Sequence, residues 1–151
     1  TLLSTFGLLG PGKSIETALK ALPEIISHVP NVIYLIIGKT HPNAIENNVD
    51  IYRDYLKDLV AFYKLNDYVF FIDHYLEINE LLAYLQATDI YLFTSKDPNQ
   101  AVSGTFTYAM SCACPIVATS IAHTREILTP DIGILIDIDE SKQLAEAVKK
   151  L

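Results

Sequence analysis

The fold is decided by a short stretch in the first third of the chain, VIYLII at residues 32–37. A continuous apolar run of this length is typical of a β-strand that is buried on both faces. Apolar side chains recur at helical spacing over residues 14–28 before it and over residues 52–63 after it. Pro23 lies inside the first of these stretches, where we expect it to kink the helix. We therefore predict a buried strand between two helices.

The same alternation continues to both ends of the chain. Further strands are predicted at residues 2–9, 68–72, 89–93, 115–118 and 133–136, and further helices at residues 78–85, 103–113, 124–128 and 144–151. About six strands that alternate with crossover helices predict a single α/β domain over residues 1–151, a doubly wound Rossmann-like parallel sheet with helices on both faces. The commonest order of six such strands is 3-2-1-4-5-6, and ligands bind where the connections of strands 1 and 4 diverge.

The composition limits the kinds of protein this can be. The chain has 151 residues, half of them hydrophobic, which is enough for a packed core and excludes a disordered chain. The net charge is −7 and no basic face is apparent, which argues against nucleic-acid binding. The two cysteines, Cys112 and Cys114, are too close together to staple a fold and too few for a zinc site. They favour core positions in a cytoplasmic protein.

The ends of the sequence predict a larger protein. The chain begins at Thr1 within an apolar segment, and its single methionine is Met110. We therefore expect a piece of a longer chain, in which a second domain precedes this one. No apolar run is long enough to span a membrane and no signal-peptide pattern opens the chain, so peripheral membrane association of the full-length protein stays open.

A glycine-rich segment follows the first predicted strand, at the edge where the ligand crevice is expected. Its sequence is GLLGPGKS at residues 7–14, with glycines at Gly7, Gly10 and Gly12. Glycines let a backbone approach a phosphate closely, and Lys13 would supply a positive charge. The simple alternative is a glycine-rich turn that carries a surface lysine.

The spacing of this segment also matches the P-loop of nucleoside triphosphatases, G-x-x-x-x-G-K-[ST]. Such enzymes need an acidic residue at a strand end to hold magnesium, whereas Asp89 begins its predicted strand. Pro11 removes one backbone donor from the phosphate cradle. Both features argue against the P-loop interpretation.

A second unusual segment follows the fourth predicted strand, DPNQAVSGT at residues 97–105. Ser103, Gly104 and Thr105 stand at a predicted helix N-terminus, whose free amides and hydroxyls can receive a phosphate. Asn99 and Gln100 can hydrogen-bond sugar hydroxyls. The alternative is ordinary helix capping by Ser103 or Thr105. Two such segments at one crevice indicate a nucleotide ligand, and we expect them to meet side by side.

Four landmarks occur in order along the chain. They are FGLLGPGKSIE at residues 6–16, YLIIGKTHPN at 34–43, ATDIYLFTS at 87–95 and NQAVSGTFTYAMSCACPIVATSIAHTREIL at 99–128. Together they resemble the family 4, or group 1, glycosyltransferases with the GT-B fold. The resemblance implies the donor-binding domain of a two-domain enzyme that transfers a hexose from a nucleoside diphosphate sugar, with retention, to a glycan, lipid or other acceptor. The acceptor would bind on the N-terminal domain.

The resemblance also implies roles for individual residues. Lys13 resembles the lysine that binds the donor diphosphate, although its usual arginine partner would fall at Leu8. Gly38 resembles the glycine that ends the second strand near the donor, and the loop at residues 73–76 resembles the stretch that lines the nucleobase. No metal and no cofactor is expected, because a lysine and helix amides can stabilise the departing diphosphate.

Much of the family carries two glutamates eight positions apart, and here these positions hold Gln100 and Tyr108. With Lys13, we assign Gln100 to the catalytic groups, and we expect it to contact the sugar without a charge. Tyr108 would reach a ribose hydroxyl with its phenol or simply pack.

Two other functions stay open from the sequence. A nucleotide-sugar epimerase of related fold would need acidic or histidine side chains in the crevice, and Gln100 and Tyr108 argue against them. A non-catalytic nucleotide-binding module would share the fold alone. His41 is expected near the crevice, whereas Asp137 and Asp139 are expected on solvated faces.

Overall fold

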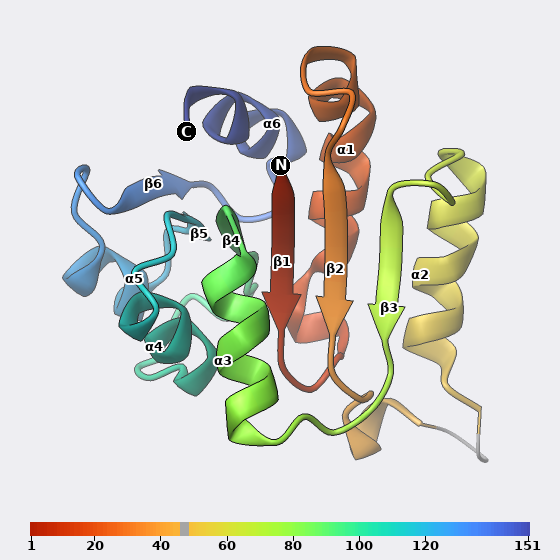
Figure 1. Ribbon diagram of the computed structural model, residues 1–151. Coiled ribbons are helices and arrows are strands. Elements are labelled where there is room, and N and C mark those ends of the chain that lie inside the picture. The colour runs from red at the N-terminus through yellow and green to blue at the C-terminus, as the bar shows by residue number, and fades with distance from the viewer. Residues whose placement is uncertain (46–48) are drawn as a thin grey trace.

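A computed structural model describes residues 1–45 and 49–151 of the chain (Figure 1). Its centre is a six-stranded parallel sheet in the order β3-β2-β1-β4-β5-β6. The strands are β1 (Leu2–Phe6), β2 (Ile33–Ile37), β3 (Val69–Ile72), β4 (Ile90–Phe93), β5 (Ile116–Thr119) and β6 (Gly133–Ile136). The predicted Rossmann-like strand order is confirmed.

Helices cover both faces of the sheet. They are α1 (Ile15–His28), α2 (Ile51–Phe62), α3 (Ile78–Ala87), α4 (Gly104–Ser111), α5 (Ala122–Ile127) and α6 (Ser141–Lys150), with 3₁₀ turns η1 (Pro11–Lys13) and η2 (Pro42–Ala44). The apolar side chains of α1, α2 and α6 share one buried cluster. Those of α3 and α4 share the other, together with Ile121 and Leu128 on either side of α5. Figure 1 shows α3 and α4 in front of the sheet and α1 behind it.

β2 shows how the decisive stretch fixes this arrangement. Tyr34 and Ile36 point into the cluster of α1, α2 and α6, and Ile37 points into the opposite cluster. The side chains of a strand alternate between faces, so an apolar residue at every position needs helices on both sides. Burial raises the pKa of Tyr34, and its hydroxyl is satisfied by a 2.7 Å hydrogen bond with Thr5 Oγ1.

The end of the first predicted strand differs from the structure. The first strand ends at Phe6, not at residue 9, because Gly7 adopts a φ of +128° that breaks the extended path. Leu9 still pairs with the segment after β2, since its amide donates to Lys39 O at 2.8 Å. Pro23 is exposed, and α1 continues past it to His28.

The sheet order places the two glycine-bearing segments at one edge. The chain leaves β1 for α1 on one face and leaves β4 for α4 on the other face. β1 and β4 are neighbours and parallel, so both segments begin at the same end of the sheet (Figure 1).

Candidate functional site

The turn after β1 and the start of α4 meet at Gly7. A Cβ built on Gly7 would lie 2.9 Å from Lys13 Nζ and 2.8 Å from Thr105 Cγ2. The Lys13 ammonium also lies 3.5 Å from the carbonyl oxygen of Phe6. The predicted meeting of the two segments is confirmed, and Lys13 lies at their junction.

The backbone around Lys13 is held by the end of β4. Thr94 Oγ1 donates to Lys13 O at 2.6 Å, and the amide of Lys96 donates to Gly12 O at 2.8 Å. Burial of the ammonium lowers the pKa of Lys13 from 10.5 to about 8. The lysine is therefore a partly desolvated cation in a fixed place, as an anion-binding group requires.

The segment at residues 7–14 does not form a P-loop cradle. The amide of Lys13 donates to Gly10 O at 2.9 Å and that of Ser14 to Pro11 O at 3.2 Å, so the turn uses its own donors. The Ser14 hydroxyl donates to Asp139 Oδ1 at 2.6 Å, away from the position of a P-loop metal. The structure thus supports the rejection of the triphosphatase interpretation.

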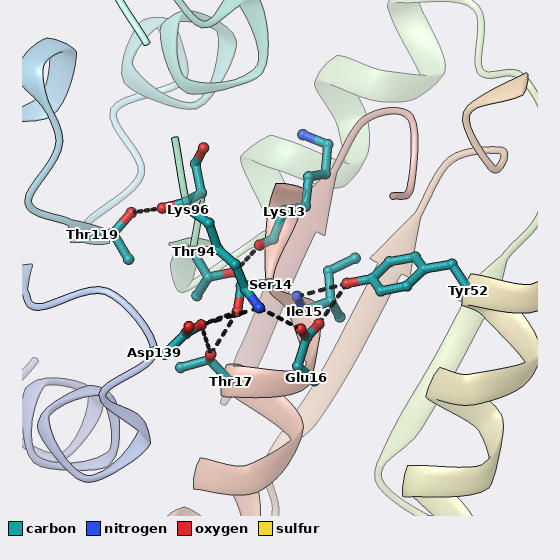
Figure 2. Close-up of polar contacts among 11 residues, drawn as sticks. Lys13, Ser14, Ile15, Glu16, Thr17, Tyr52, Thr94, Lys96, Thr119 and Asp139 are labelled. Carbon is teal, nitrogen blue, oxygen red and sulfur yellow. Dashed lines mark hydrogen bonds and ion pairs between the residues drawn. The ribbon is translucent and has the colours of Figure 1, made fainter. Parts of the chain in front are cut away.

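A polar cluster underlies this turn (Figure 2). Lys96 Nζ lies 2.9 Å from Glu16 Oε1 and 3.4 Å from Asp139 Oδ1, and Tyr52 donates its hydroxyl to Glu16 Oε2 at 2.7 Å. Hydrogen bonding by Ser14, together with the charge of Lys96, lowers the pKa of Asp139. Asp139 is exposed, as expected, but its carboxylate also links the segment before α6 to the Lys13 turn through Ser14.

Sequence reasoning missed Glu16 and Lys96. Glu16 follows Ile15 at the start of an amphipathic helix, where acidic residues are common for electrostatic reasons alone. Its partner Lys96 lies 80 positions away. Only the chain topology, which brings the end of β4 to the start of α1, could have linked them.

The start of α4 carries both a cap and free donors. Ser103 Oγ accepts from the amide of Phe106 at 3.4 Å, so the capping role weighed for Ser103 is present. The first backbone bond within the helix runs from Thr107 N to Ser103 O at 3.0 Å. The amides of Gly104 and Thr105 precede this bond, and such amides have no acceptor within their own helix.

Two cavities flank this junction. The first has a volume of about 520 Å³ and is lined in part by Gly10, Gly12, Lys13, His41 and Gln100. The second, of about 310 Å³, is lined in part by Gly7, Gly38, His74, Tyr75, Leu76 and Tyr108. Leu8 lines both cavities. The two cavities and the lysine between them would suit a ligand whose two ends are joined by an anionic group.

Of the two residues predicted to contact the sugar, Gln100 lies at the crevice and Asn99 does not. Gln100 lines the first cavity, but its side chain accepts from Ser95 Oγ at 2.8 Å and donates to Val102 O at 3.2 Å. Asn99 is exposed and is absent from the lining of either cavity. The structure therefore brings Gln100 to the crevice with its amide already engaged and leaves Asn99 outside.

Gly38 packs against the Gly7 turn. Its φ is +122°, and a Cβ there would overlap the carbonyl oxygen of Gly7. Arg53, which sequence reasoning also missed, donates from Nη2 to Gly38 O at 2.8 Å and pairs with Asp73 Oδ1 at 2.9 Å. This buried arginine therefore ties together the ends of β2 and β3, next to the second cavity.

A family model described as "Glycosyl transferases group 1" matches residues 1–151. The chain belongs to this glycosyltransferase family. No curated protein matches the chain. The predicted group 1 assignment is confirmed.

Solved glycosyltransferase structures share the fold. Anabaena Alr3699/HepE in complex with UDP has a TM-score of 0.84 and 23% identity, over 99% of this chain and 38% of that one, and its complex with UDP-glucose has a TM-score of 0.82, also with 23% identity and the same coverage. The C-terminal domain of the group 1 family protein LpcC from Francisella tularensis has a TM-score of 0.83 and 22% identity, over 99% and 74% of the two chains. This chain spans about two fifths of the Anabaena protein.

Within residues 1–45 and 49–151, no three His, Cys, Asp or Glu side chains come together as a metal site would need. In the same ranges no helix has the length and apolar character needed to cross a bilayer. Cys114 is buried, with Sγ 3.0 Å from Leu85 O, which agrees with its predicted core position.

Proposed function

We propose that this chain is the donor-binding part of a retaining glycosyltransferase of family 4. It would move a hexose from a nucleoside diphosphate sugar to a glycan, lipid or other acceptor. One observation carries the proposal: the Lys13 ammonium meets the first turn of α4 at Gly7, between two cavities. Membership of the glycosyltransferase family supports it, as do the UDP and UDP-glucose complexes of the Anabaena protein.

The junction and its cavities match the three parts of such a donor. The diphosphate would bind Lys13 Nζ and the amides of Gly104 and Thr105, because helix N-termini and lysines both favour anions. The nucleoside would occupy the second cavity, where Tyr108 is exposed and within reach of a ribose. The sugar would occupy the first cavity, where Gln100 would exchange its contacts within its own loop for sugar hydroxyls.

The chemistry follows from the charge that develops on the leaving group. The bond between the anomeric carbon and the diphosphate oxygen breaks, and its electron pair stays on the diphosphate. Lys13 and the N-terminus of α4 would stabilise that charge without a metal. An acceptor hydroxyl forms the new bond on the same face of the sugar and gives its proton to the departing diphosphate. A second domain would supply the acceptor site.

Titration calorimetry of the chain with UDP, UDP-glucose, GDP and ADP tests donor binding. Replacing Lys13 with Met removes charge-assisted hydrogen bonds worth about 1.5–3 kcal/mol, so the affinity for the preferred diphosphate should fall by roughly 10–150-fold. Lys20→Met changes an exposed lysine of α1 and should leave the affinity unchanged.

Three outcomes would contradict the proposal. If no nucleoside diphosphate binds, the chain has no donor site. Tight binding that is indifferent to Lys13→Met would indicate a non-catalytic module instead. Conversion of UDP-glucose to another nucleotide sugar without acceptor would indicate an epimerase.

A further inference from the structure

The Lys13 turn is held from below by a group of polar side chains, which we call the Lys96 cluster. Its members are Ser14, Glu16, Thr17, Tyr52, Lys96 and Asp139. They come from the residue before α1, the first turn of α1, α2, the segment after β4 and the segment before α6. Figure 2 shows the Lys13 side chain pointing away from this cluster, toward the opposite side of the turn. The cluster is therefore placed to support Lys13 without sharing its ligand.

Lys96 faces away from the crevice. Its neighbours Ser95 and Asp97 line the first cavity, but Lys96 does not belong to the lining of either cavity. Its ammonium instead lies 2.9 Å from Glu16 Oε1 and 3.4 Å from Asp139 Oδ1. Hydrogen bonding to Glu16 raises the pKa of Lys96, so the cation is fully charged at neutral pH. Lys96 can therefore affect a bound donor only indirectly, through the position of the backbone that it contacts.

That backbone is the Lys13 turn itself. The Lys96 amide donates to Gly12 O at 2.8 Å, so this residue grips the turn through its main chain as well as through Glu16. Thr94, two positions earlier, donates to Lys13 O at 2.6 Å. The carbonyl groups on both sides of the Lys13 Cα are thus held from one strand end. A shift of that strand end relative to α1 would move the Lys13 ammonium.

The turn also needs support because of its conformation. Ser14 has a φ of +46°, in the left-handed region that non-glycine residues rarely adopt. Its hydroxyl lies 2.6 Å from Asp139 Oδ1 and 2.8 Å from Thr17 Oγ1, and these contacts offset the strain. Without Lys96, two carboxylates would face each other beside Ser14, and their repulsion would push the turn open.

We propose that Lys96 is a positioning residue of the donor site. It sets the place of the Lys13 ammonium by neutralising Glu16 and Asp139 beneath the turn, and it makes no contact with the donor. The inference rests on the proposed function, because it assumes that Lys13 binds the diphosphate. If so, a change at Lys96 should weaken binding of the diphosphate part of the ligand and leave binding of the nucleoside part unchanged.

The test compares UDP with uridine, which lacks the diphosphate. Lys96→Met should weaken UDP binding by about 10-fold, because the charge-assisted contacts of a displaced lysine are lost, and should leave uridine binding unchanged. Lys96→Arg keeps a cation for the two carboxylates and should restore most of the UDP affinity. Lys142→Met, at an exposed lysine of α6, is the matched control.

The outcomes separate this inference from the proposed function. Wild-type protein that binds no nucleoside diphosphate overturns the proposed function, whatever the variants do. Wild-type protein that binds UDP, together with a Lys96→Met variant of equal UDP affinity, overturns the positioning role alone. Equal losses for UDP and uridine also overturn it, because they indicate general damage.

A second variant covers the case in which Lys96→Met fails to fold. Asp139→Ala changes a residue whose side chain is about half exposed, so the fold should tolerate it. It removes the acceptor of the Ser14 hydroxyl while keeping Lys96 paired with Glu16. The positioning role predicts weaker UDP binding and unchanged uridine binding for this variant too, and unchanged binding of both ligands would contradict it.

Discussion

The hydroxyl of Tyr52, on α2, donates to Oε2 of Glu16, in the first turn of α1, at 2.7 Å. The same hydroxyl accepts from the amide of Ile15 at 3.1 Å. Burial and the bond to Glu16 both raise the pKa of Tyr52, so the phenol stays protonated and available as a donor. One side chain thus satisfies a buried carboxylate and an otherwise unpaired helix amide.

Tyr52→Phe should therefore cost about 1–3 kcal/mol of unfolding free energy, because two buried polar groups lose their partner. Urea unfolding followed by circular dichroism measures this cost. Tyr55→Phe is the control, since Tyr55 is exposed on the same helix and should change stability by less than about 0.5 kcal/mol. Equal stability of the two variants would show that the Tyr52 hydroxyl contributes nothing.

This relationship also shows where sequence reasoning stops. The strand order and the helices on both faces were predictable. Apolar periodicity is a local signal that identifies each strand and helix, and short right-handed connections between them favour a parallel sheet. Lys13 and the start of α4 were predictable as a pair, because adjacent strand ends must share an edge. Glu16, Lys96 and Asp139 were not, because each alone resembles an ordinary surface charge.

The hydrogen bonds of the Gln100 amide could not be predicted from the sequence either. Its partners, Ser95 and Val102, belong to the same loop, and no spacing rule specifies how an irregular loop folds back on itself. Arg53 was overlooked because a charged residue within an amphipathic helix is normally solvated. It is instead buried with Gly38 O and Asp73 as partners.

Gly7→Ala should damage both the fold and the donor site. Its φ of +128° is unfavourable for alanine by about 1–3 kcal/mol, and the new methyl group would displace Lys13 Nζ or Thr105 Cγ2. We expect a lower Tm and weaker UDP binding, measured by differential scanning calorimetry and titration. In Gly12→Ala the methyl group meets nothing within 4 Å, so its Tm should stay at or above that of the wild type. A Gly7→Ala protein with wild-type Tm would refute the strain argument.

Arg53→Met should affect the nucleoside end of the site. It leaves Asp50 and Asp73 without their cation and leaves the buried Gly38 O without its donor, and because both carboxylates keep access to solvent we expect a cost of about 1–3 kcal/mol. Because Gly38 and the segment after Asp73 line the second cavity, uridine binding should weaken together with UDP binding. Lys57→Met, which removes an exposed pair with Asp54, should change neither stability nor binding. Retention of uridine affinity by a folded Arg53→Met protein would contradict this role.

The pKa of Lys13 predicts a proton uptake that accompanies donor binding. Burial lowers this pKa to about 8, so at pH 8 about half of the empty sites carry a neutral lysine. A diphosphate binds the charged form and should draw in about half a proton per site at pH 8, whereas uptake should be small at pH 6.5. Titration of UDP in buffers of different ionisation enthalpy measures this number directly.

The same pKa shift has a consequence for stability. Lys13 in the unfolded chain keeps its proton up to about pH 10.5, whereas the folded chain releases it near pH 8. Between these values the unfolded state binds more protons, so the contribution of Lys13 to stability rises with pH. Lys13→Met should abolish both the proton uptake with UDP and this rise. If the uptake persists in Lys13→Met, another group supplies the charge that meets the diphosphate.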